Sequence, residues 1–194
     1  MNTALAICAG IALAAACGFR VFVPLLATAL AAHLGYITPS PGMAWIGGTP
    51  ALIILSVATV AEILGYYIPW VDHLLDTITS PAAVLAGTLA AAAAFGNIDP
   101  AVKWALALIA GGGAAAVFQT GTVVARAASG ATTAGVANPI VSTIENIGAI
   151  ILSALAILLP ILAIALLLIM AAVMLKLYRW FRRRKQQMPE PATA

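Results

Sequence analysis

Long runs of apolar residues, separated by a few prolines, glycines and charges, make up most of this chain. The runs cover residues 3–35, 50–68, 82–96, 101–118 and 147–178. A helix needs about 20 apolar residues to cross a bilayer, and several of the runs reach that length. They lack the alternation of barrel strands, and only helices satisfy every backbone polar group within one segment. The pattern therefore predicts an all-α fold: a polytopic transmembrane helical bundle of about five to seven membrane segments, some of them broken or kinked.

Two of the apolar runs are too long for a single upright span. Residues 3–35 would extend about 50 Å as one helix, against a hydrocarbon core of roughly 30 Å. Arg20 and Pro24 interrupt this run, which leaves two interpretations open: one kinked, strongly tilted helix, or two half-helices that meet at Arg20. Pro160 interrupts residues 147–178, so that run is either one kinked helix or a half-helix followed by a span.

Polar side chains mark one face of the helix expected over residues 50–68. They are Ser56, Thr59, Glu62 and Tyr66. Spacings of three, three and four residues place them on one side of the helix, which we expect to face the bundle interior. Pro69 is expected to end this helix, and Asp72 and Asp76 lie one turn apart on the next. The segment 119–146 is rich in small and hydroxyl residues, which pack between helices, so we expect it inside the bundle.

Basic residues gather at the C-terminal end of the chain. They are Lys176, Arg179, Arg182, Arg183, Arg184 and Lys185. Basic residues beside a span favour the cytoplasmic side and attract anionic lipid head groups. We therefore expect one transmembrane domain over residues 1–182 and a basic, then polar, cytoplasmic tail over 183–194. The loop over 36–49 has no basic residue and is expected on the opposite side.

The composition narrows the class of protein further. Hydrophobic residues make up 63% of the 194 residues and charged residues 8%, which is too little charge for the surface of a soluble domain. The start of the chain lacks the basic region of a cleaved signal peptide. Cys8 and Cys17 point to opposite faces of one helix and are not expected to bridge. The sequence contains no recognisable nucleophile, phosphate-loop, zinc or haem motif, so we expect no enzyme activity, cofactor or metal, and no nucleic-acid partner.

Four ionisable residues lie in or beside the apolar runs. They are Arg20, Glu62, Arg126 and Glu145. Each costs about 2.5–3.5 kcal/mol at a helix centre, so together they cost roughly 10–14 kcal/mol, comparable with the stability of a whole domain. We expect them to pair, Arg20 with Glu145 and Arg126 with Asp76. Three interpretations stay open: buried pairs that only fix helix register, a polar pathway or binding site, or solvation at the interface.

Carboxylates also gather around Asp72. With Glu62 and Asp76, this residue offers the oxygen ligands that hard cations prefer, so the three are candidates for holding a cation or relaying protons. Acidic residues equally favour the first turn of a helix, and Asp72 is alternatively an N-terminal cap. His73 lies next to it, and His33 is expected at the membrane interface.

Two pairs of segments suggest an internal repeat. Residues 4–16 align without gaps with 105–117 and match at seven of thirteen positions (ALAICAGIALAAA and ALALIAGGGAAAV). Residues 74–90 resemble 140–156 (LLDTITSPAAVLAGTLA and IVSTIENIGAIILSALA). The halves would be 3–96 and 104–181. Many transporters are built from inverted repeats whose broken helices meet near the midplane, and we expect that arrangement here.

Three motifs stand in order along the chain: GFRVFVPLL from Gly18, AEILGYYIPWVDHLLDTITSPAAVLAGTL from Ala61, and ATTAGVANPIVSTIENIGA from Ala131. They resemble motifs of a bacterial family known as a domain of unknown function, DUF4126. The resemblance implies a polytopic inner-membrane protein and brings no established activity. Some members carry an acid–lysine pair where this chain has Tyr66 and Tyr67, and a second acid where it has Asn146, so any role of those charges is not shared here.

Seven residues are therefore candidates for binding a solute or ion or for lining its pathway: Arg20, Glu62, Asp72, Asp76, Arg126, Asn138 and Glu145. We expect a small-solute or ion transporter or channel with a charged polar site inside the bundle. The alternative is a structural or accessory membrane protein whose intramembrane charges are buried ion pairs. A wet cavity touching Arg20, Arg126 and Glu145 favours transport, and closed pairs without a cavity favour the alternative. The identity of the solute and the formation of a homo-oligomer are left open.

Overall fold

Every regular element of the described chain is a helix, which confirms the all-α prediction. The computed structural model describes residues 2–68, 71–133 and 135–186. The elements are α1 (Thr3–Cys17), α2 (Phe22–His33), the 3₁₀-helix η1 (Ala44–Gly47), α3 (Thr49–Gly65), α4 (Val71–Ala94), α5 (Pro100–Leu106), the π-helix η2 (Ala107–Gly112), α6 (Gly113–Thr133), α7 (Asn138–Leu158) and α8 (Pro160–Gln186). Pro69, the last residues of the predicted tail and Met1 lie outside the described residues.

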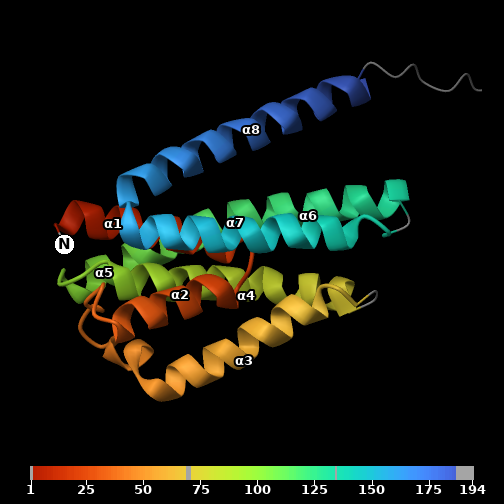
Figure 1. Cartoon of the computed structure of the whole chain (residues 1–194). Coiled ribbons are helices and arrows are strands. Elements are labelled where there is room, and N and C mark those ends of the chain that lie inside the picture. The colour runs from red at the N-terminus through yellow and green to blue at the C-terminus, as the bar shows by residue number, and fades with distance from the viewer. Residues whose placement is uncertain (1, 69–70, 134, 187–194) are drawn as a thin grey trace, which may run out of the picture.

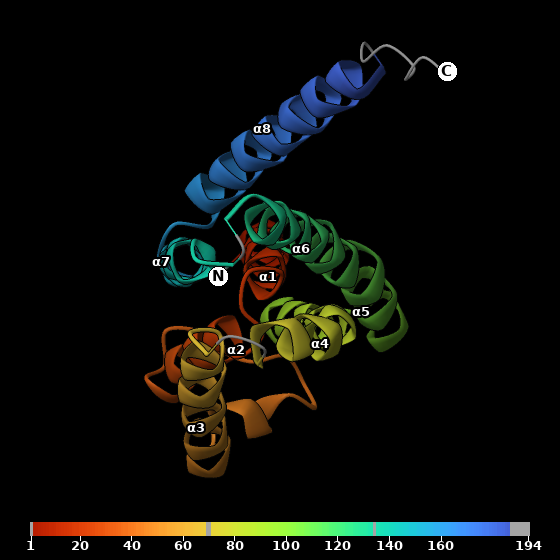
Figure 2. The same ribbon diagram turned by 90° about the vertical axis from the view of Figure 1, so that its right-hand side faces the viewer.

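Three stretches of helix in the described ranges are long and apolar enough to cross a membrane. They are Leu74–Ala94, Pro100–Thr133 and Asn138–Leu158. Four shorter apolar helices accompany them: Thr3–Cys17, Phe22–His33, Thr49–Gly65 and Pro160–Lys176. α5, η2 and α6 follow one another without a break. The π-helical turn η2 includes Gly111 and Gly112, and Gly113 begins α6. Figures 1 and 2 show these helices as one bundle, with α3 and α8 at opposite outer edges.

α1 and α2 form a hairpin of two half-helices. At 1.5 Å per residue they are about 22 and 18 Å long, shorter than a hydrocarbon core of roughly 30 Å. Gly10 of α1 packs against Phe95 and Ala91, and the N–H of Ser40, beyond α2, donates to the carbonyl of Ala93 at 2.9 Å. The two open ends of the hairpin therefore both lie near the C-terminal end of α4, at one end of the bundle. Of the two interpretations of this run, the structure has the half-helices that meet at Arg20.

Small residues allow the centre of the bundle to pack closely. A Cβ added to Gly87 of α4 would lie 2.6 Å from the Cβ of Ala115 and 3.2 Å from the carbonyl oxygen of Ala14. One added to Gly111 would lie 2.6 Å from the Cβ of Ala91. α1, α4 and the η2–α6 segment therefore meet backbone to backbone, as helices do at small-residue interfaces. The alanine-rich sequence thus builds a tight core at the side from which the hairpin enters.

Pro160 separates two helices rather than kinking one. α7 ends at Leu158 and α8 begins at Pro160, where the missing N–H of proline is tolerated in a first helical turn. α8 packs on α1 and α7 near its start and then diverges from the bundle (Figure 1). α7 begins at Asn138, so the polar segment 119–146 is shared between α6 and α7.

The repeated segments point the same way rather than opposite ways. Gly18, the residue after α1, packs against Ala115 and Gln119, while Gly111 packs near Ala14, so α1 runs parallel to η2–α6. The first turns of α4 and α7 are joined by a hydrogen bond between Asp72 and Asn138, and both helices run away from that end in Figure 1. This is the geometry of a parallel repeat, so the inverted arrangement expected from the sequence is not found for these segments.

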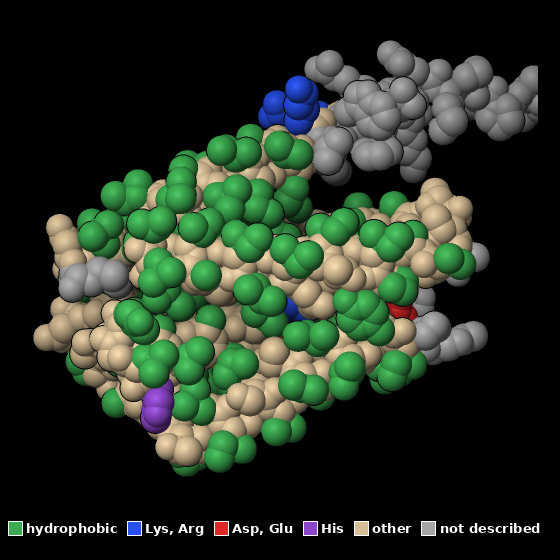
Figure 3. Space-filling model, in the orientation of Figure 1, with side chains coloured by type: hydrophobic (Ala, Val, Ile, Leu, Met, Phe, Trp, Pro, Cys, Tyr) green, Lys and Arg blue, Asp and Glu red, His purple; other side chains and the backbone are tan. Residues whose placement is uncertain are grey.

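Apolar side chains dominate the face of the molecule seen in Figure 3, and Lys, Arg, Asp and Glu colour only small areas of it. The polar stripe predicted on α3 is partly correct. Thr59, Glu62 and Tyr66 are buried, but Ser56 is exposed. α3 lies at the edge of the bundle and packs mainly on α2, so only the C-terminal part of the stripe reaches the interior.

Candidate functional site

A charge cluster surrounds the tip of the α1–α2 hairpin. It comprises Arg20, Glu62, Asp76, Arg126 and Glu145, arranged about the ring of Tyr66. The tip supplies Arg20, α3 supplies Glu62, α4 supplies Asp76, and α6 and α7 supply Arg126 and Glu145. Helices that are far apart in sequence thus bring the predicted candidates to one place.

Glu145 is the centre of the cluster, because both guanidinium groups converge on its carboxylate. Its Oε2 lies 3.3 Å from Nη2 of Arg20 and accepts a hydrogen bond from Nη2 of Arg126. Its Oε1 accepts a hydrogen bond from Nε of Arg126 at 3.3 Å. Nε of Arg126 also lies 3.7 Å from Oδ1 of Asp76. Both pairs expected from the sequence, Arg20 with Glu145 and Arg126 with Asp76, are therefore present.

Tyr66 gives the two guanidinium groups a common platform. Cζ of Arg20 lies 3.9 Å from the ring centroid and Cζ of Arg126 lies 4.0 Å from it. Such cation–π contacts strengthen when water is excluded, and Tyr66 is only 4% exposed. Its hydroxyl hydrogen-bonds Thr79 of α4 at 2.9 Å. The sequence pattern placed Tyr66 on the inward face but gave no sign of this role.

Two residues of α7 complete the arginine contacts and are missing from the predicted candidates. The side-chain oxygen of Asn146 accepts a hydrogen bond from Nε of Arg20. The backbone oxygen of Ser142 accepts from Nη2 of Arg20 at 3.1 Å, and its Oγ accepts from Nη1 of Arg126 at 3.2 Å. The spacing of 142, 145 and 146 places them on one helical face with Asn138, a signal that could have identified them.

Glu62 binds backbone rather than an arginine. Its Oε1 accepts from the N–H of Val21 at 2.7 Å, and its Oε2 accepts from the N–H of Phe22 at 3.0 Å. These N–H groups belong to the first turn of α2, which has no intrahelical acceptor for them and carries a positive partial charge. Glu62 therefore caps a half-helix that begins inside the bundle.

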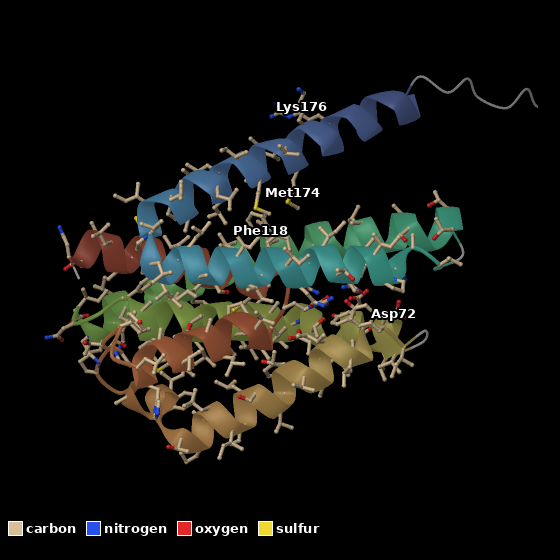
Figure 4. All side chains as sticks on the ribbon, viewed as in Figure 1. Asp72, Phe118, Met174 and Lys176 are labelled. Atoms are coloured by element: carbon tan, nitrogen blue, oxygen red, sulfur yellow. The ribbon has the colours of Figure 1, made fainter. Side chains whose placement is uncertain are left out.

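Asp72 forms a separate contact nearer the end of the bundle, where Figure 4 labels it at the start of α4. Its Oδ2 accepts from Nδ2 of Asn138 at 2.8 Å, while Oδ1 of Asn138 is buried without a hydrogen-bond partner. Glu62, Asp72 and Asp76, candidates for holding a cation or relaying protons, do not gather as a cation site, since the described residues contain no group of three such ligands. The reason is that Glu62 turns toward α2. The side chain of His73 lies outside the described part of the structure.

The described side chains of this region carry more negative than positive charge. Within the charge cluster, three carboxylates, Glu62, Asp76 and Glu145, accompany two guanidinium groups, Arg20 and Arg126, so the formal balance of these described side chains is two minus three, or −1. Except for the half-buried Asp76, these side chains are at most 5% exposed. A buried surplus of this kind is costly unless hydrogen bonds, protons or cations offset it.

An apolar groove of about 450 Å³ reaches the cluster from the side. α6, α7 and the diverging α8 form its walls, with Phe118 and Met174 facing each other across it in Figure 4. Glu145 lines it, but Arg20 and Arg126 do not. Its lining is almost wholly apolar, so it is not a wet cavity that touches Arg20, Arg126 and Glu145.

A second polar contact lies at the opposite end of the bundle. Lys103 of α5 is 4% exposed, and its Nζ donates to the carbonyl of Pro41 at 2.9 Å and to Oγ of Ser40 at 3.3 Å. Ser40 in turn donates to the carbonyl of Ala92 at 2.6 Å. The contact ties the 34–48 loop to the C-terminal end of α4. It was not anticipated, because Lys103 looks like an ordinary interfacial lysine in the sequence.

The C-terminal basic residues continue α8 beyond its apolar part. Lys176 and Arg179 are exposed, and Lys176 points away from the bundle in Figure 4. The side chains from 180 onward lie outside those described. The predicted contact with anionic lipid remains a prediction.

Fold and site together define a helical membrane protein whose buried charge cluster lies at the tip of the α1–α2 hairpin. A family model described as "Domain of unknown function (DUF4126)" matches residues 7–180, and the chain belongs to that family. The search of curated proteins found no match, and neither did the search of solved structures.

Proposed function

We propose that this protein is a transporter or channel for a small solute or ion, that the charge cluster is its polar site, and that the described conformation is closed. The observation that carries the proposal is a helix broken inside the bundle, whose second half begins among five ionisable side chains. Non-helical backbone at membrane depth occurs where it is buried in protein or lines a pathway, and transporter sites are built from such half-helices. Intramembrane charges are functional by default because they are expensive.

The surplus of carboxylates supports a coupled ion. A formal surplus of one carboxylate among the described side chains of the cluster favours uptake of a proton or cation as part of the working cycle. Neutralising even one carboxylate would change which partner each guanidinium holds. The cluster can therefore exist in more than one bonding pattern, as a transport cycle requires.

The structural alternative is favoured by a different observation. The pairs are in direct contact, with Arg20 and Arg126 both bonded to Glu145, and the groove that reaches Glu145 is apolar. Closed pairs of this kind are what an accessory protein would use to fix helix register. The experiment below separates the two functions.

Proton flux into liposomes tests the proposal. Purified protein would be reconstituted with an internal pH dye, and a potassium diffusion potential would drive protons inward. We expect flux above that of protein-free liposomes, and we expect it to fall strongly in Glu62→Gln and Glu145→Gln. Asp99→Asn is the matched control, because it makes the same charge change at the surface cap of α5. Unchanged flux in both cluster variants would remove those carboxylates from the mechanism and favour the structural role.

We further propose a bacterial inner-membrane location with the C-terminus in the cytoplasm. The support is the run of basic residues at the end of α8 and the positive-inside bias. The 34–48 loop then lies on the other side of the membrane, at the end of the bundle where the hairpin opens.

A further inference from the structure

The first turn of α2 holds a carboxylate in the way that a transporter holds an anionic substrate. Each oxygen of Glu62 accepts one backbone hydrogen bond, from Val21 at 2.7 Å and from Phe22 at 3.0 Å. α2 has 12 residues, and its dipole adds positive partial charge at this end. Half-helix N-termini inside a bundle bind the anionic groups of transported substrates. Here the bound anion is a side chain of the protein itself.

Two buried polar groups beside this contact have no hydrogen-bond partner. They are Nη1 of Arg20 and Oγ1 of Thr59, and the two residues are 1% and 7% exposed. Arg20 directly precedes the turn, and its guanidinium lies on the ring of Tyr66, one turn along α3 from Glu62. Thr59 lies one turn before Glu62 on the same face of α3. A guanidinium nitrogen of the residue before the turn and a hydroxyl one helical turn from Glu62 are therefore left without hydrogen-bond partners, which is more than a structural cap needs.

We propose that the first turn of α2 is the binding site for a small planar oxyanion of the carboxylate class, and that Glu62 occupies this site in the closed state. The two oxygens of the solute take the N–H groups of Val21 and Phe22, and Nη1 of Arg20 donates a third bond. Two adjacent N–H groups fit the paired oxygens of a carboxylate, as Glu62 itself demonstrates. The inference rests on the proposed function, because it names the solute class of the same charge cluster.

The exchange of one anion for another is balanced by a proton. Two carboxylates in one buried site repel each other, so Glu62 leaves as the neutral acid after taking one proton from solution for each anion bound. The turn then holds one negative charge before and after the exchange. The hydroxyl of Thr59 supplies an acceptor for the new O–H of Glu62. The charged or titratable groups of neighbouring elements that act on Glu62 are Arg20, Arg126 and the thiol of Cys17, and Tyr66 follows on its own helix.

Calorimetric titration of formate into the purified protein tests this exchange, with chloride at equal ionic strength as the reference. Titrations in two buffers of different ionisation enthalpy give the number of protons taken up. We expect wild type to bind formate with uptake of about one proton. Glu62→Gln removes the competing charge, so it should bind formate about tenfold or more tightly and take up no proton. Failure of formate to bind to either protein, or binding to wild type without proton uptake, would overturn the inference.

A rescue experiment keeps the test decisive if Glu62→Gln folds poorly. Glu62→Ala frees the two N–H groups of α2, and added formate should raise its unfolding midpoint to a plateau, whereas chloride should not. Asp99→Ala is the matched control, because Asp99 also accepts from two N–H groups of a helix start, at 2.9 and 3.1 Å, but on the exposed surface. Equal effects of formate on both variants, or none on Glu62→Ala, would contradict a built site at α2.

The two proposals fail separately. Uptake of one proton with one formate moves no net charge, so the liposome assay is repeated with an inward formate gradient in place of the diffusion potential. Formate binding with proton uptake, but no proton flux in either assay, would leave the anion site standing and contradict the transport function. Proton flux that depends on Glu62 and Glu145, without any binding of formate, would remove the anion site alone.

Discussion

Replacing Glu145 by glutamine removes the carboxylate on which both buried arginines converge. The change keeps the shape of the side chain and deletes one negative charge. Glu145 is 5% exposed, and the side chains of Arg20 and Arg126 are 0% and 3% exposed. The amide that replaces the carboxylate has one acceptor oxygen, and its NH₂ group faces guanidinium donors. Glu145→Gln therefore leaves Arg20 without its carboxylate partner, and Arg126 with Asp76 alone at 3.7 Å.

The expected cost follows from that geometry. Removing one partner of a buried ion pair costs about 3–5 kcal/mol, because the remaining charge is uncompensated. Asp76→Asn is the matched comparison within the same cluster. Asp76 is 17% exposed at its side chain and lies 3.7 Å from Arg126, which is closer to a solvated pair worth about 0–1 kcal/mol. The double variant Arg126→Gln/Glu145→Gln should lose less than the sum of the two single changes, with a coupling of about 0.5–3 kcal/mol.

Reversible unfolding in mixed micelles, followed by circular dichroism, would give these free energies. Reaction of a thiol dye provides an independent probe, because Cys17 is fully buried and Cys8→Ser removes the more accessible thiol. A loss below about 1 kcal/mol in Glu145→Gln, or strict additivity in the double variant, would show that the pairs are not the buried, coupled contacts described here.

Two further predictions concern packing and the second polar contact. Gly87→Ala places a Cβ 2.6 Å from that of Ala115 and should destabilise the bundle by about 1–3 kcal/mol. Gly113→Ala has nothing within 4 Å of the new Cβ, so its stability should be unchanged or higher by up to about 1 kcal/mol. Unfolding midpoints that ranked the two variants the other way would refute the close approach at Gly87. Lys103→Met keeps the aliphatic part of the side chain but leaves the carbonyl of Pro41 without its hydrogen-bond donor. It should therefore lower stability by about 1–2 kcal/mol and speed proteolysis of the 34–48 loop, whereas Lys176→Met, at an exposed position, should change stability by less than about 0.5 kcal/mol. Equal proteolysis rates in the two variants would count against the Lys103 contact.

The sequence predicted the partners in the cluster better than its geometry. Complementary charge was enough to predict the pairs of Arg20 with Glu145 and Arg126 with Asp76, because so apolar a chain contains few other charged residues that could be their partners. Glu145 pairs with both arginines because the hairpin tip reaches far enough into the bundle. No local sequence pattern predicts that depth. Glu62 was expected inside the bundle, but its partner is the backbone of Val21 and Phe22. That contact exists only because the chain reverses at Arg20.

Other elements were missed for related reasons. Ser56 fits the polar stripe of α3 but is exposed, because α3 lies at the edge of the bundle and only its later turns meet other helices. The sequence similarity of the repeated segments could not show whether they run parallel or antiparallel, since an alignment of residues contains no information on orientation in space. Lys103 and Tyr66 gained their roles from residues far along the chain.

The proposed polar site and the proposed anion site both depend on residues 3–33 forming a hairpin that does not cross the membrane, and labelling of single cysteines tests that arrangement most directly. In a background without Cys8 and Cys17, cysteines would replace Asn2, Tyr36 and Val136, which are all exposed. A membrane-impermeant maleimide would be applied to intact cells and to inverted vesicles. The hairpin predicts that Asn2→Cys and Tyr36→Cys react from the same side and Val136→Cys from the other. Reaction of Asn2→Cys and Tyr36→Cys from opposite sides would mean that residues 3–33 cross the membrane, and the site at the hairpin tip would not exist.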